Sequence, residues 1–149
     1  MVSILLVAHA PLASSLQAVA CHTYNECRPQ VGAVDVPPGA TLEQAQAQIT
    51  DALKNLPPNT DVLILADVFG ATPCNAALNV DDGVHTRVVA GANVPTLWRT
   101  LCYSQLPLAD LVARAVDGGR SGIMQVATPR PQNQPQRPSC NDPDQHSDQ

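Results

Sequence analysis

Hydrophobic runs and amphipathic stretches alternate along the first 127 residues of the chain. Four short runs of aliphatic and β-branched residues fit strands that are buried on both faces of a parallel sheet. These runs cover residues 2–8, 31–36, 62–66 and 84–90. Stretches with apolar residues at helical spacing follow them, at about 13–27, 42–56, 73–79, 96–104 and 108–117. The alternation predicts an α/β fold, a doubly wound sheet of four parallel strands with helices on both faces.

Capping residues mark the start of two of the predicted helices. Thr41, with Gln44 three residues further on, forms a capping-box signature before the second helix. Thr72 is placed to cap the third helix, and Pro73 suits the first turn of that helix. These local signals support the helix positions that the hydrophobic spacing indicates.

The character of the chain changes near its C-terminal end. We expect Gly118-Gly119 to break the last helix and residues 121–127 to form a fifth strand. From residue 128 onward the sequence is rich in proline and glutamine and holds almost nothing apolar. Such a segment cannot bury enough surface to offset its ordering entropy. We therefore expect one folded domain over residues 1–127 and a disordered tail over 128–149.

Composition and charge exclude several classes of function. The formal net charge of -5 argues against a nucleic-acid surface, and the aromatic content of 3% argues against a stacking platform for single strands. No stretch reaches the roughly 20 apolar residues that a membrane span needs. Residues 1–21 end in a sequence that mimics a lipoprotein cleavage box, but no Lys or Arg precedes the apolar part and polar residues interrupt it. We expect no export and no direct membrane insertion.

The five cysteines are odd in number and lack the spacing of a small secreted domain. This favours reduced thiols in a cytoplasmic protein. Cys21, His22 and Cys27 have the chemistry of metal ligands, but on a helix residues 21 and 27 diverge in direction, and no C-x-x-C motif exists. We therefore expect no metal site.

Titratable residues stand where two of the predicted strands end. His9 follows the first apolar run, and Asp67 follows the third. In open α/β sheets ligands collect at the carboxyl ends of the strands, so these side chains meet if the two strands are neighbours. Gly70, Ala71 and Thr72 form a loop of small residues before a helix. Their N–H groups and the helix dipole fit an anion, and phosphate is the natural guest.

A neutral imidazole beside a carboxylate is suited to nucleophilic chemistry. A carboxylate that accepts a hydrogen bond from one ring nitrogen fixes the tautomer and leaves the other nitrogen to react. The arrangement predicts phosphoryl transfer to and from His9, without a P-loop or dinucleotide fingerprint. Spacing alone also allows His9 to be a turn residue, Asp67 to begin a loop and Thr72 only to cap a helix. An α/β domain with an anion pocket is then the alternative.

Four segments of the chain resemble the enzyme IIA component of the mannose-type family in the bacterial phosphoenolpyruvate-dependent sugar phosphotransferase system. They are VAHA around His9, DVPPGAT at 35–41, DVFGATPCNAA at 67–77 and GANVPTL at 91–97. Their order and spacing are kept, and the resemblance covers about residues 1–127. The domain over 1–127 is therefore identified as a mannose-type enzyme IIA domain, and the tail lies outside the resemblance.

The resemblance implies a phosphotransferase component that carries phosphohistidine. It implies that His9 accepts a phosphoryl group from the small phosphocarrier HPr and passes it to a IIB domain. Asp67 is then the hydrogen-bonding partner of the histidine, and Thr72 binds the phosphate together with the backbone of Gly70 and Ala71. No cofactor is implied beyond the phosphoryl group, which comes from phosphoenolpyruvate through HPr.

The resemblance also implies a homodimer. The family fold has four parallel strands and a fifth, antiparallel edge strand that the two subunits exchange, and residues 121–127 are the candidate for it. The chain departs from the family pattern at a few positions. Ala8 and Ala10 flank His9 where the family usually has threonine and glycine, and Phe69 stands for a usual tryptophan. Thr72 stands for a usual serine and keeps the hydroxyl.

Three other functions share some of these features. The first is a regulatory enzyme IIA of an incomplete phosphotransferase system without a transporter, which signals through its phosphorylation state. The second is the related phosphocarrier of dihydroxyacetone kinase. The third is a non-catalytic module that binds an anion at residues 67–72 while His9 is structural.

Overall fold

The computed structural model describes residues 1–24 and 30–127, and these residues form one α/β domain. The strands are β1 (Ser3–His9), β2 (Val31–Val36), β3 (Val62–Ala66) and β4 (Thr86–Ala90). The helices are α1 (Leu12–Thr23), α2 (Leu42–Lys54), α3 (Thr72–Leu78), α4 (Val94–Cys102) and α5 (Leu108–Ser121). All four strands are parallel and lie in the order β2-β1-β3-β4, which confirms the predicted parallel sheet.

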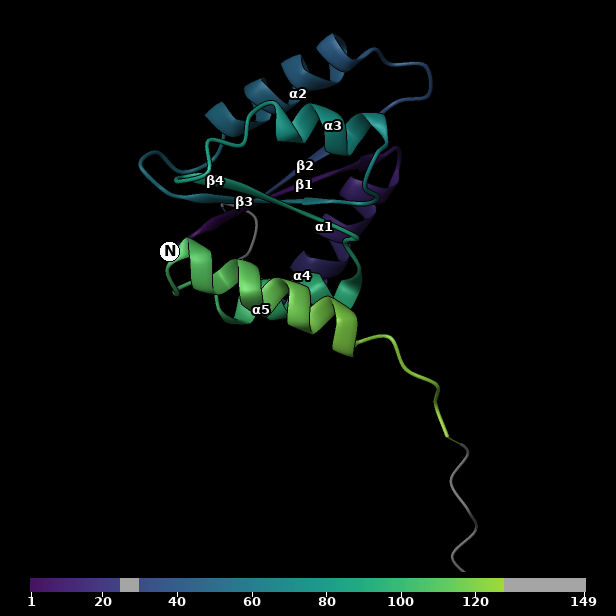
Figure 1. Cartoon of the computed structure of the whole chain (residues 1–149), viewed down its shortest axis with the longest axis vertical. Coiled ribbons are helices and arrows are strands. Elements are labelled where there is room, and N and C mark those ends of the chain that lie inside the picture. Colours follow the sequence, from purple (N-terminus) through teal and green to yellow (C-terminus); the bar gives the residue numbers. More distant parts are fainter. Residues whose placement is uncertain (25–29, 128–149) are drawn as a thin grey trace, which may run out of the picture.

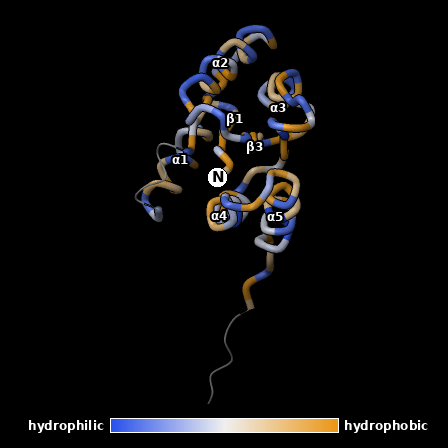
Figure 2. Tube along the Cα trace, turned by 90° about the vertical axis from the view of Figure 1, so that its left-hand side faces the viewer, coloured by the Kyte–Doolittle hydropathy of each residue, from blue (hydrophilic) through white to orange (hydrophobic). Residues whose placement is uncertain are grey.

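Helices cover both faces of this sheet, as the doubly wound pattern predicts. Helices α2 and α3 lie on one face, and α1, α4 and α5 lie on the other (Figure 1). The view turned by 90° shows the same layers, with α2 and α3 above the strands and α4 and α5 below them (Figure 2). The hydrophobic core is therefore divided into two clusters, one on each side of the sheet.

Strand β1 lies in the interior of the sheet and is buried on both faces. Ile4 and Leu6 belong to one core cluster, whereas Leu5 and Val7 belong to the other. Successive side chains of a strand point to opposite faces, so a continuous apolar run is the pattern that a two-faced strand needs. His9 is the only exposed residue of β1.

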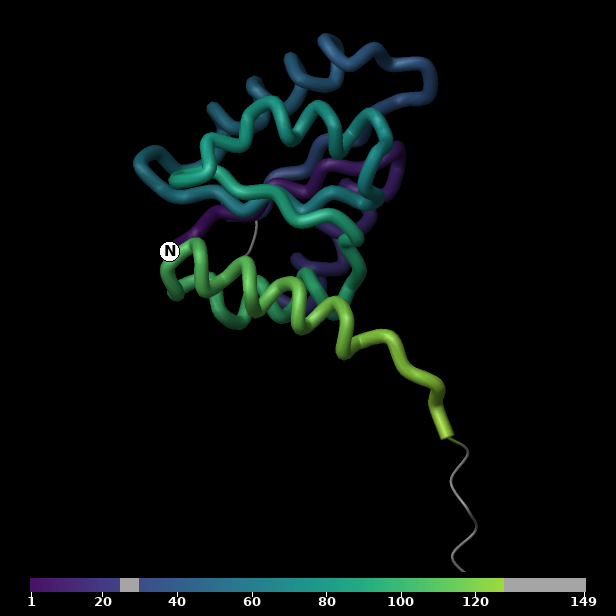
Figure 3. Tube along the Cα trace, viewed as in Figure 1, coloured from purple at the N-terminus to yellow at the C-terminus, as the bar shows by residue number. Residues whose placement is uncertain are grey.

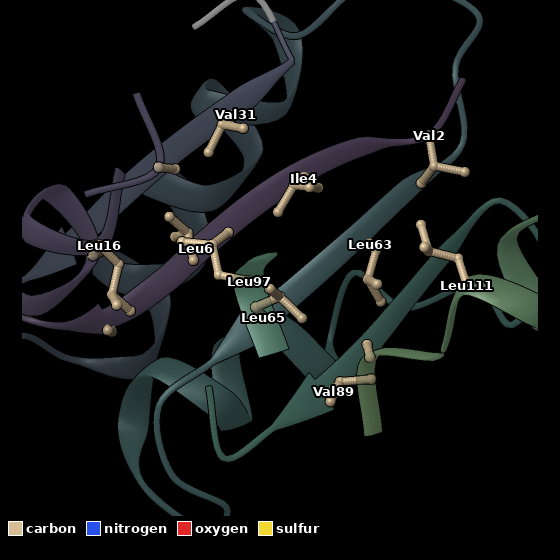
Figure 4. Packing of buried hydrophobic residues seen from close by; sticks show 14 of the residues in the cluster. Val2, Ile4, Leu6, Leu16, Val31, Leu63, Leu65, Val89, Leu97 and Leu111 are labelled. Carbon is tan, nitrogen blue, oxygen red and sulfur yellow. The ribbon is translucent and has the colours of Figure 1, made fainter. Parts of the chain in front are cut away.

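The larger cluster joins β1 and β3 to helices α4 and α5. Ile4 and Leu63 lie on adjacent strands, and Leu97 and Leu111 pack onto this face from the two helices (Figure 4). These four side chains are completely buried. Burial of a side chain of this size contributes about 1.5–3 kcal/mol, so the sheet is a firm base for the loops at its edges.

Strand register brings three strand ends to the same edge of the sheet. Ala8 and His9 of β1 lie opposite Asp35 and Val36 of β2. On the other side, Val7 lies opposite the last residue of β3, and Asp67 follows that residue directly. The ends of β1, β2 and β3 therefore carry a histidine and two aspartates at one edge.

The helix starts agree with the sequence at one position and differ at another. Thr41 and Gln44 form both hydrogen bonds of the predicted capping box. At α3 the N-cap is Ala71, and Thr72 makes no capping hydrogen bond, so the prediction that Thr72 caps this helix is wrong. The reason is that the extended backbone of Ala71 already ends the loop, and Thr72 lies inside the first turn with Pro73.

Helix α5 continues through the two glycines that were expected to break it. A Cβ at Gly118 would lie 2.6 Å from Cβ of Arg99, and one at Gly119 would lie 2.2 Å from Oγ1 of Thr96. Both glycines are buried against α4. Glycine costs about 1 kcal/mol relative to alanine in a helix, and here that cost is offset by the close approach of α4 and α5.

The chain after α5 carries exposed apolar residues. Ser121 is the last residue of α5, so a fifth strand does not begin there. Residues 123–127 form no strand within the single chain, and the trace leads away from the domain (Figure 3). Exchange of this segment between two chains stays a prediction. The predicted tail at 128–149 lies outside the described residues.

The remaining expectations have mixed outcomes. Strand β4 begins at Thr86, not at Val84, because the Asp82 carboxylate binds the N–H groups of residues 84–86 and holds the chain before Thr86 in a turn. Among the cysteines, Cys21 is disulfide-bonded, so the expectation of reduced thiols is wrong there. Cys74 and Cys102 are free thiols. Within the described chain, no helix is long and apolar enough to cross a bilayer.

Candidate functional site

The candidate site begins with the position of His9 at the end of β1. Six buried residues precede it in the strand, and its own side chain is 56% exposed. The core therefore fixes the backbone while the ring projects to solvent. A histidine in this position is accessible to another protein and cannot move far from the sheet edge.

Asp67 holds both the backbone and the ring of His9. Its Oδ2 accepts a hydrogen bond from the His9 N–H at 2.9 Å and lies 2.6 Å from Nδ1 of the ring. Its Oδ1 accepts a hydrogen bond from the Val68 N–H at 2.8 Å. The structure thus brings together the two residues that the strand-end argument paired. Because a carboxylate only accepts hydrogen bonds, Nδ1 of a neutral ring carries the hydrogen and Nε2 keeps its lone pair.

Electrostatics keep this carboxylate ionised. The Asp67 side chain is only 10% exposed, and such burial opposes ionisation. The hydrogen bonds from the His9 backbone and ring and from Val68 outweigh that effect, so the pKa of Asp67 lies below its ordinary value. The ring of His9 therefore faces a fixed negative charge.

Gly70 and Ala71 lie at the same sheet edge, between Asp67 and α3, and Thr72 is the first residue of that helix. Gly70 has a positive φ of 86°, which glycine adopts without strain. The Ala71 carbonyl accepts the N–H of Asn75, and the amide of Asn75 binds the Gly70 carbonyl, so the loop has a defined shape. Among the described residues no hydrogen bond joins this loop to His9. The Thr72 hydroxyl has no hydrogen-bond partner there either.

A buried thiol lies beneath this loop. Burial, together with the charge of Asp67, raises the pKa of Cys74, while the N–H of Gly70 acts in the opposite direction. A buried thiol with a raised pKa stays protonated and is a poor nucleophile. At this edge the exposed imidazole of His9 is therefore better suited to act as a nucleophile than the thiol of Cys74.

Two features of this edge, an exposed apolar surface and the contact made by Asp35, were not predicted from the sequence. Phe69 and Val68 are 77% and 49% exposed, which puts an apolar surface directly after Asp67. Asp35, at the end of β2, accepts a hydrogen bond from the Ser14 N–H at the start of α1. An acidic residue at the end of an apolar run was the available signal for Asp35, but the order of the strands is needed to place it beside His9. In the described part of the chain, no group of three or more His, Cys, Asp or Glu side chains is arranged to hold a metal ion.

Comparison with known proteins identifies the family. Residues 3–116 match the family model described as "PTS system fructose IIA component". The chain therefore belongs to the mannose-type enzyme IIA family of the sugar phosphotransferase system, as the four sequence segments indicated. The match covers the described sheet and its helices as far as α5.

Two curated relatives are similar in sequence. The chain is 38% identical over 96 residues to the PTS system mannose-specific EIIAB component of Escherichia coli (strain K12), covering 62% of this chain and 30% of that protein. It is 30% identical over 114 residues to the PTS system fructose-specific EIIA component of Bacillus subtilis (strain 168), covering 75% and 77%. The chain thus spans less than a third of the length of the E. coli relative.

Solved structures have the same fold. The mannose/sorbose specific IIA subunit of the phosphotransferase system from Enterococcus faecalis superposes with a TM-score of 0.76 at 26% identity, covering 86% of this chain and 96% of that one. Phosphotransferase system component EIIA from Streptococcus agalactiae superposes with a TM-score of 0.74 at 18% identity, covering 84% and 97%. The second likeness supports the fold alone.

Proposed function

We propose that this chain is a phosphohistidine carrier in a sugar phosphotransferase relay. His9 accepts a phosphoryl group from HPr and passes it to a IIB-type acceptor. The observation that carries the proposal is the exposed ring of His9 with Nδ1 bound to the nearly buried Asp67. Membership of the enzyme IIA family supports the same reaction class.

The reaction needs no proton to leave the ring. The lone pair of Nε2 attacks the phosphorus, and the bond between the phosphoryl group and its donor breaks as the new nitrogen–phosphorus bond forms. The ring gains positive charge, and it keeps the Nδ1 hydrogen that it donates to Asp67. The ionised carboxylate stabilises this charge, and the reverse process delivers the phosphoryl group to the acceptor.

The loop after Asp67 is the proposed phosphate binder. Gly70 and Ala71 contribute backbone N–H groups, that of Gly70 by exchanging its weak thiol acceptor, Cys74, for a phosphate oxygen. Thr72 contributes its hydroxyl, which has no other partner among the described residues. Donors aimed at a developing anion stabilise it without reorganisation. The carrier needs no resident cofactor, because the phosphoryl group derives from phosphoenolpyruvate through HPr.

Phosphorylation in vitro tests the proposal. The full chain is incubated with enzyme I, HPr and labelled phosphoenolpyruvate, and acid-labile, base-stable label is measured. We expect label on the wild type and none on His9→Ala. His85→Ala is the matched control, because His85 also binds an aspartate but lies at the opposite edge of the sheet. It should be labelled like the wild type.

The outcomes separate the remaining candidates. Absence of label on the wild type would contradict a carrier and leave the anion-binding module. Label on His9→Ala would assign the phosphoryl group to another residue. Transfer of label from the protein to a purified mannose-type IIB domain supports the relay. A labelled protein that transfers to no IIB domain fits the regulatory enzyme IIA of an incomplete system or the phosphocarrier of dihydroxyacetone kinase, and transfer of label to a purified dihydroxyacetone kinase separates these two.

A homodimer with exchanged edge strands belongs to the same proposal. β4 is an edge strand, and a cavity beside it is lined by Val89 and Val116 and by Ile123 from the segment after α5. Ile123, Met124 and Val126 are 78%, 70% and 86% exposed in the single chain. Pairing of this segment with β4 of a second copy covers both the apolar residues and the open edge. Light scattering should give a dimer, and Val126→Asp should weaken it.

The proposal also fixes the expected setting of the protein. Residues 1–127 are the carrier domain, and residues 128–149 are a tail outside it. The partners are other proteins of the relay, and we expect them to meet this chain in the cytoplasm. Cell fractionation with an antibody against the chain tests this location.

A further inference from the structure

The carboxylate of Asp35 binds the chain segment that follows His9. Asp35 lies opposite Ala8 in the β1–β2 register, and its Oδ1 accepts a hydrogen bond from the Ser14 N–H at 3.0 Å. Since β1 lies between β2 and β3, Asp35 and Asp67 reach the residues around His9 from opposite sides. Neither the sequence pattern nor the proposed reaction assigns a role to Asp35.

This contact replaces a cap that α1 lacks. The N-cap of α1 is Pro11, which makes no side-chain capping hydrogen bond. The first N–H groups of a helix need an acceptor, and a Ser, Thr, Asp or Asn at the N-cap usually supplies it. Asp35 supplies the acceptor from a neighbouring strand instead. Its negative charge also complements the positive end of the helix dipole.

The segment after β1 is consequently held at three points. Asp67 binds the N–H of His9, a β2 carbonyl binds the N–H of Ala10 at 3.0 Å, and Asp35 binds the N–H of Ser14. The first two contacts fix the start of the segment. The third contact fixes the point at which the chain enters α1, so its removal leaves the segment free to move at one end.

We propose that Asp35 is a positioning residue for phosphoryl transfer at His9. It holds the start of α1 at the sheet edge, so that the ring keeps Nδ1 on Asp67 and presents Nε2 to the partner. This inference rests on the proposed carrier function of His9. Reacting atoms must be held close to their productive geometry, so a small displacement far from the reacting bond slows the reaction.

Three variants of the full chain test the inference through the rate of phosphorylation by HPr. Asp35→Ala removes the acceptor, and we expect a rate about tenfold lower. Asp35→Asn keeps a carbonyl acceptor at the same place, and its rate should stay within about twofold of the wild type. Asp82→Ala is the control, because Asp82 binds the N–H groups of Val84 and Thr86 in a comparable cap at the opposite edge. Its rate should be unchanged.

Nuclear magnetic resonance gives a readout that does not need phosphorylation. In Asp35→Ala, the Ser14 amide should exchange faster with solvent and the ring nitrogen signals of His9 should shift. Asp35→Asn should restore both, and Asp82→Ala should change neither. An Asp35→Ala protein with wild-type ring signals and transfer rate would overturn the inference.

Two further outcomes are also decisive. An Asp35→Asn variant as slow as Asp35→Ala would assign the effect to charge instead of the hydrogen bond, and this too would overturn the positioning role. If the wild type takes no label, the carrier proposal fails. The His9 ring signals in the two Asp35 variants then still decide whether Asp35 positions the ring.

Discussion

The two edges of the sheet each carry a histidine that is bound to an aspartate, and the surroundings of the two pairs differ. At the carboxyl edge, His9 and Asp67 are 2.6 Å apart, and the Asp67 side chain is 10% exposed. At the amino edge, His85 and Asp61 are 2.8 Å apart, and the Asp61 side chain is 40% exposed. The histidine–aspartate distance is therefore nearly the same in the two pairs, and the pairs differ in the burial of the aspartate and in the groups around it.

Backbone N–H groups account for much of this difference. At the amino edge, a single Asp82 oxygen accepts hydrogen bonds from the N–H groups of Val84, His85 and Thr86. These three donors are therefore not available to bind an anion. At the carboxyl edge, the N-cap of α3 is Ala71, which has no side-chain acceptor. A histidine–aspartate pair becomes a candidate phosphoryl site where donors beside it remain available for an anion.

The largest expected effect within this comparison comes from the two aspartates. Asp67→Ala should lower the rate of phosphoryl transfer from HPr by about 100-fold, because the ring loses both its fixed tautomer and the compensating charge. Asp61→Ala should leave the rate unchanged. Rapid-quench measurements with labelled HPr give both rates, and circular dichroism checks that both variants fold. Equal rates in the two variants would remove the functional distinction between the two edges.

A smaller effect is expected from removing a threonine hydroxyl, and only at the carboxyl edge. Thr72→Ala should slow transfer by about tenfold, since one donor to the phosphoryl group is lost while the backbone donors remain. Thr72→Ser should restore the rate. The matched control is Thr86→Ala at the start of β4, whose hydroxyl is far from the proposed site. The same rapid-quench assay measures all three, and a wild-type rate in Thr72→Ala would exclude the hydroxyl from phosphate binding.

The fold was largely predictable because its signals are local. The apolar run from Ile4 to Val7 is typical of a strand that is buried on both faces, and the capping box of Thr41 and Gln44 spans only four consecutive residues. The pairing of His9 with Asp67 was predictable on the condition that their strands are neighbours. The structure supplies that condition through the order β2-β1-β3-β4.

The features that sequence reasoning missed depend on contacts between distant segments. Gly118 and Gly119 look like a helix break in the sequence, but their lack of side chains serves the packing of α5 on α4. The contact of Asp35 with Ser14 requires β2 to lie beside β1, which hydrophobic periodicity does not reveal. The late start of β4 is different, because its cause is local: the carboxylate of Asp82 competes for backbone N–H groups a few residues further on, and hydrophobic periodicity does not record that competition.

The smallest effect is expected in the pH dependence of stability, and its sign differs between the edges. The pKa of Asp67 is lowered in the fold, so its contribution is present above the ordinary carboxyl pKa and is lost as the pH falls through the lowered value. Hydrogen bonding to Asp61 and its charge raise the pKa of His85 above 6.5. That contribution is full below 6.5 and is lost as the pH rises through the raised value.

Urea unfolding midpoints from acid to mildly alkaline pH measure both contributions. The difference between the wild type and Asp67→Asn should shrink as the pH falls below the ordinary carboxyl pKa of about 4, whereas that between the wild type and His85→Gln should shrink as the pH rises through the raised pKa of His85. The His85 effect should be the weaker one, because its pair is exposed to solvent and is screened by it. If both differences shrink toward acid, the His85 pair does not stabilise the fold through its charge, and the two edges do not oppose each other.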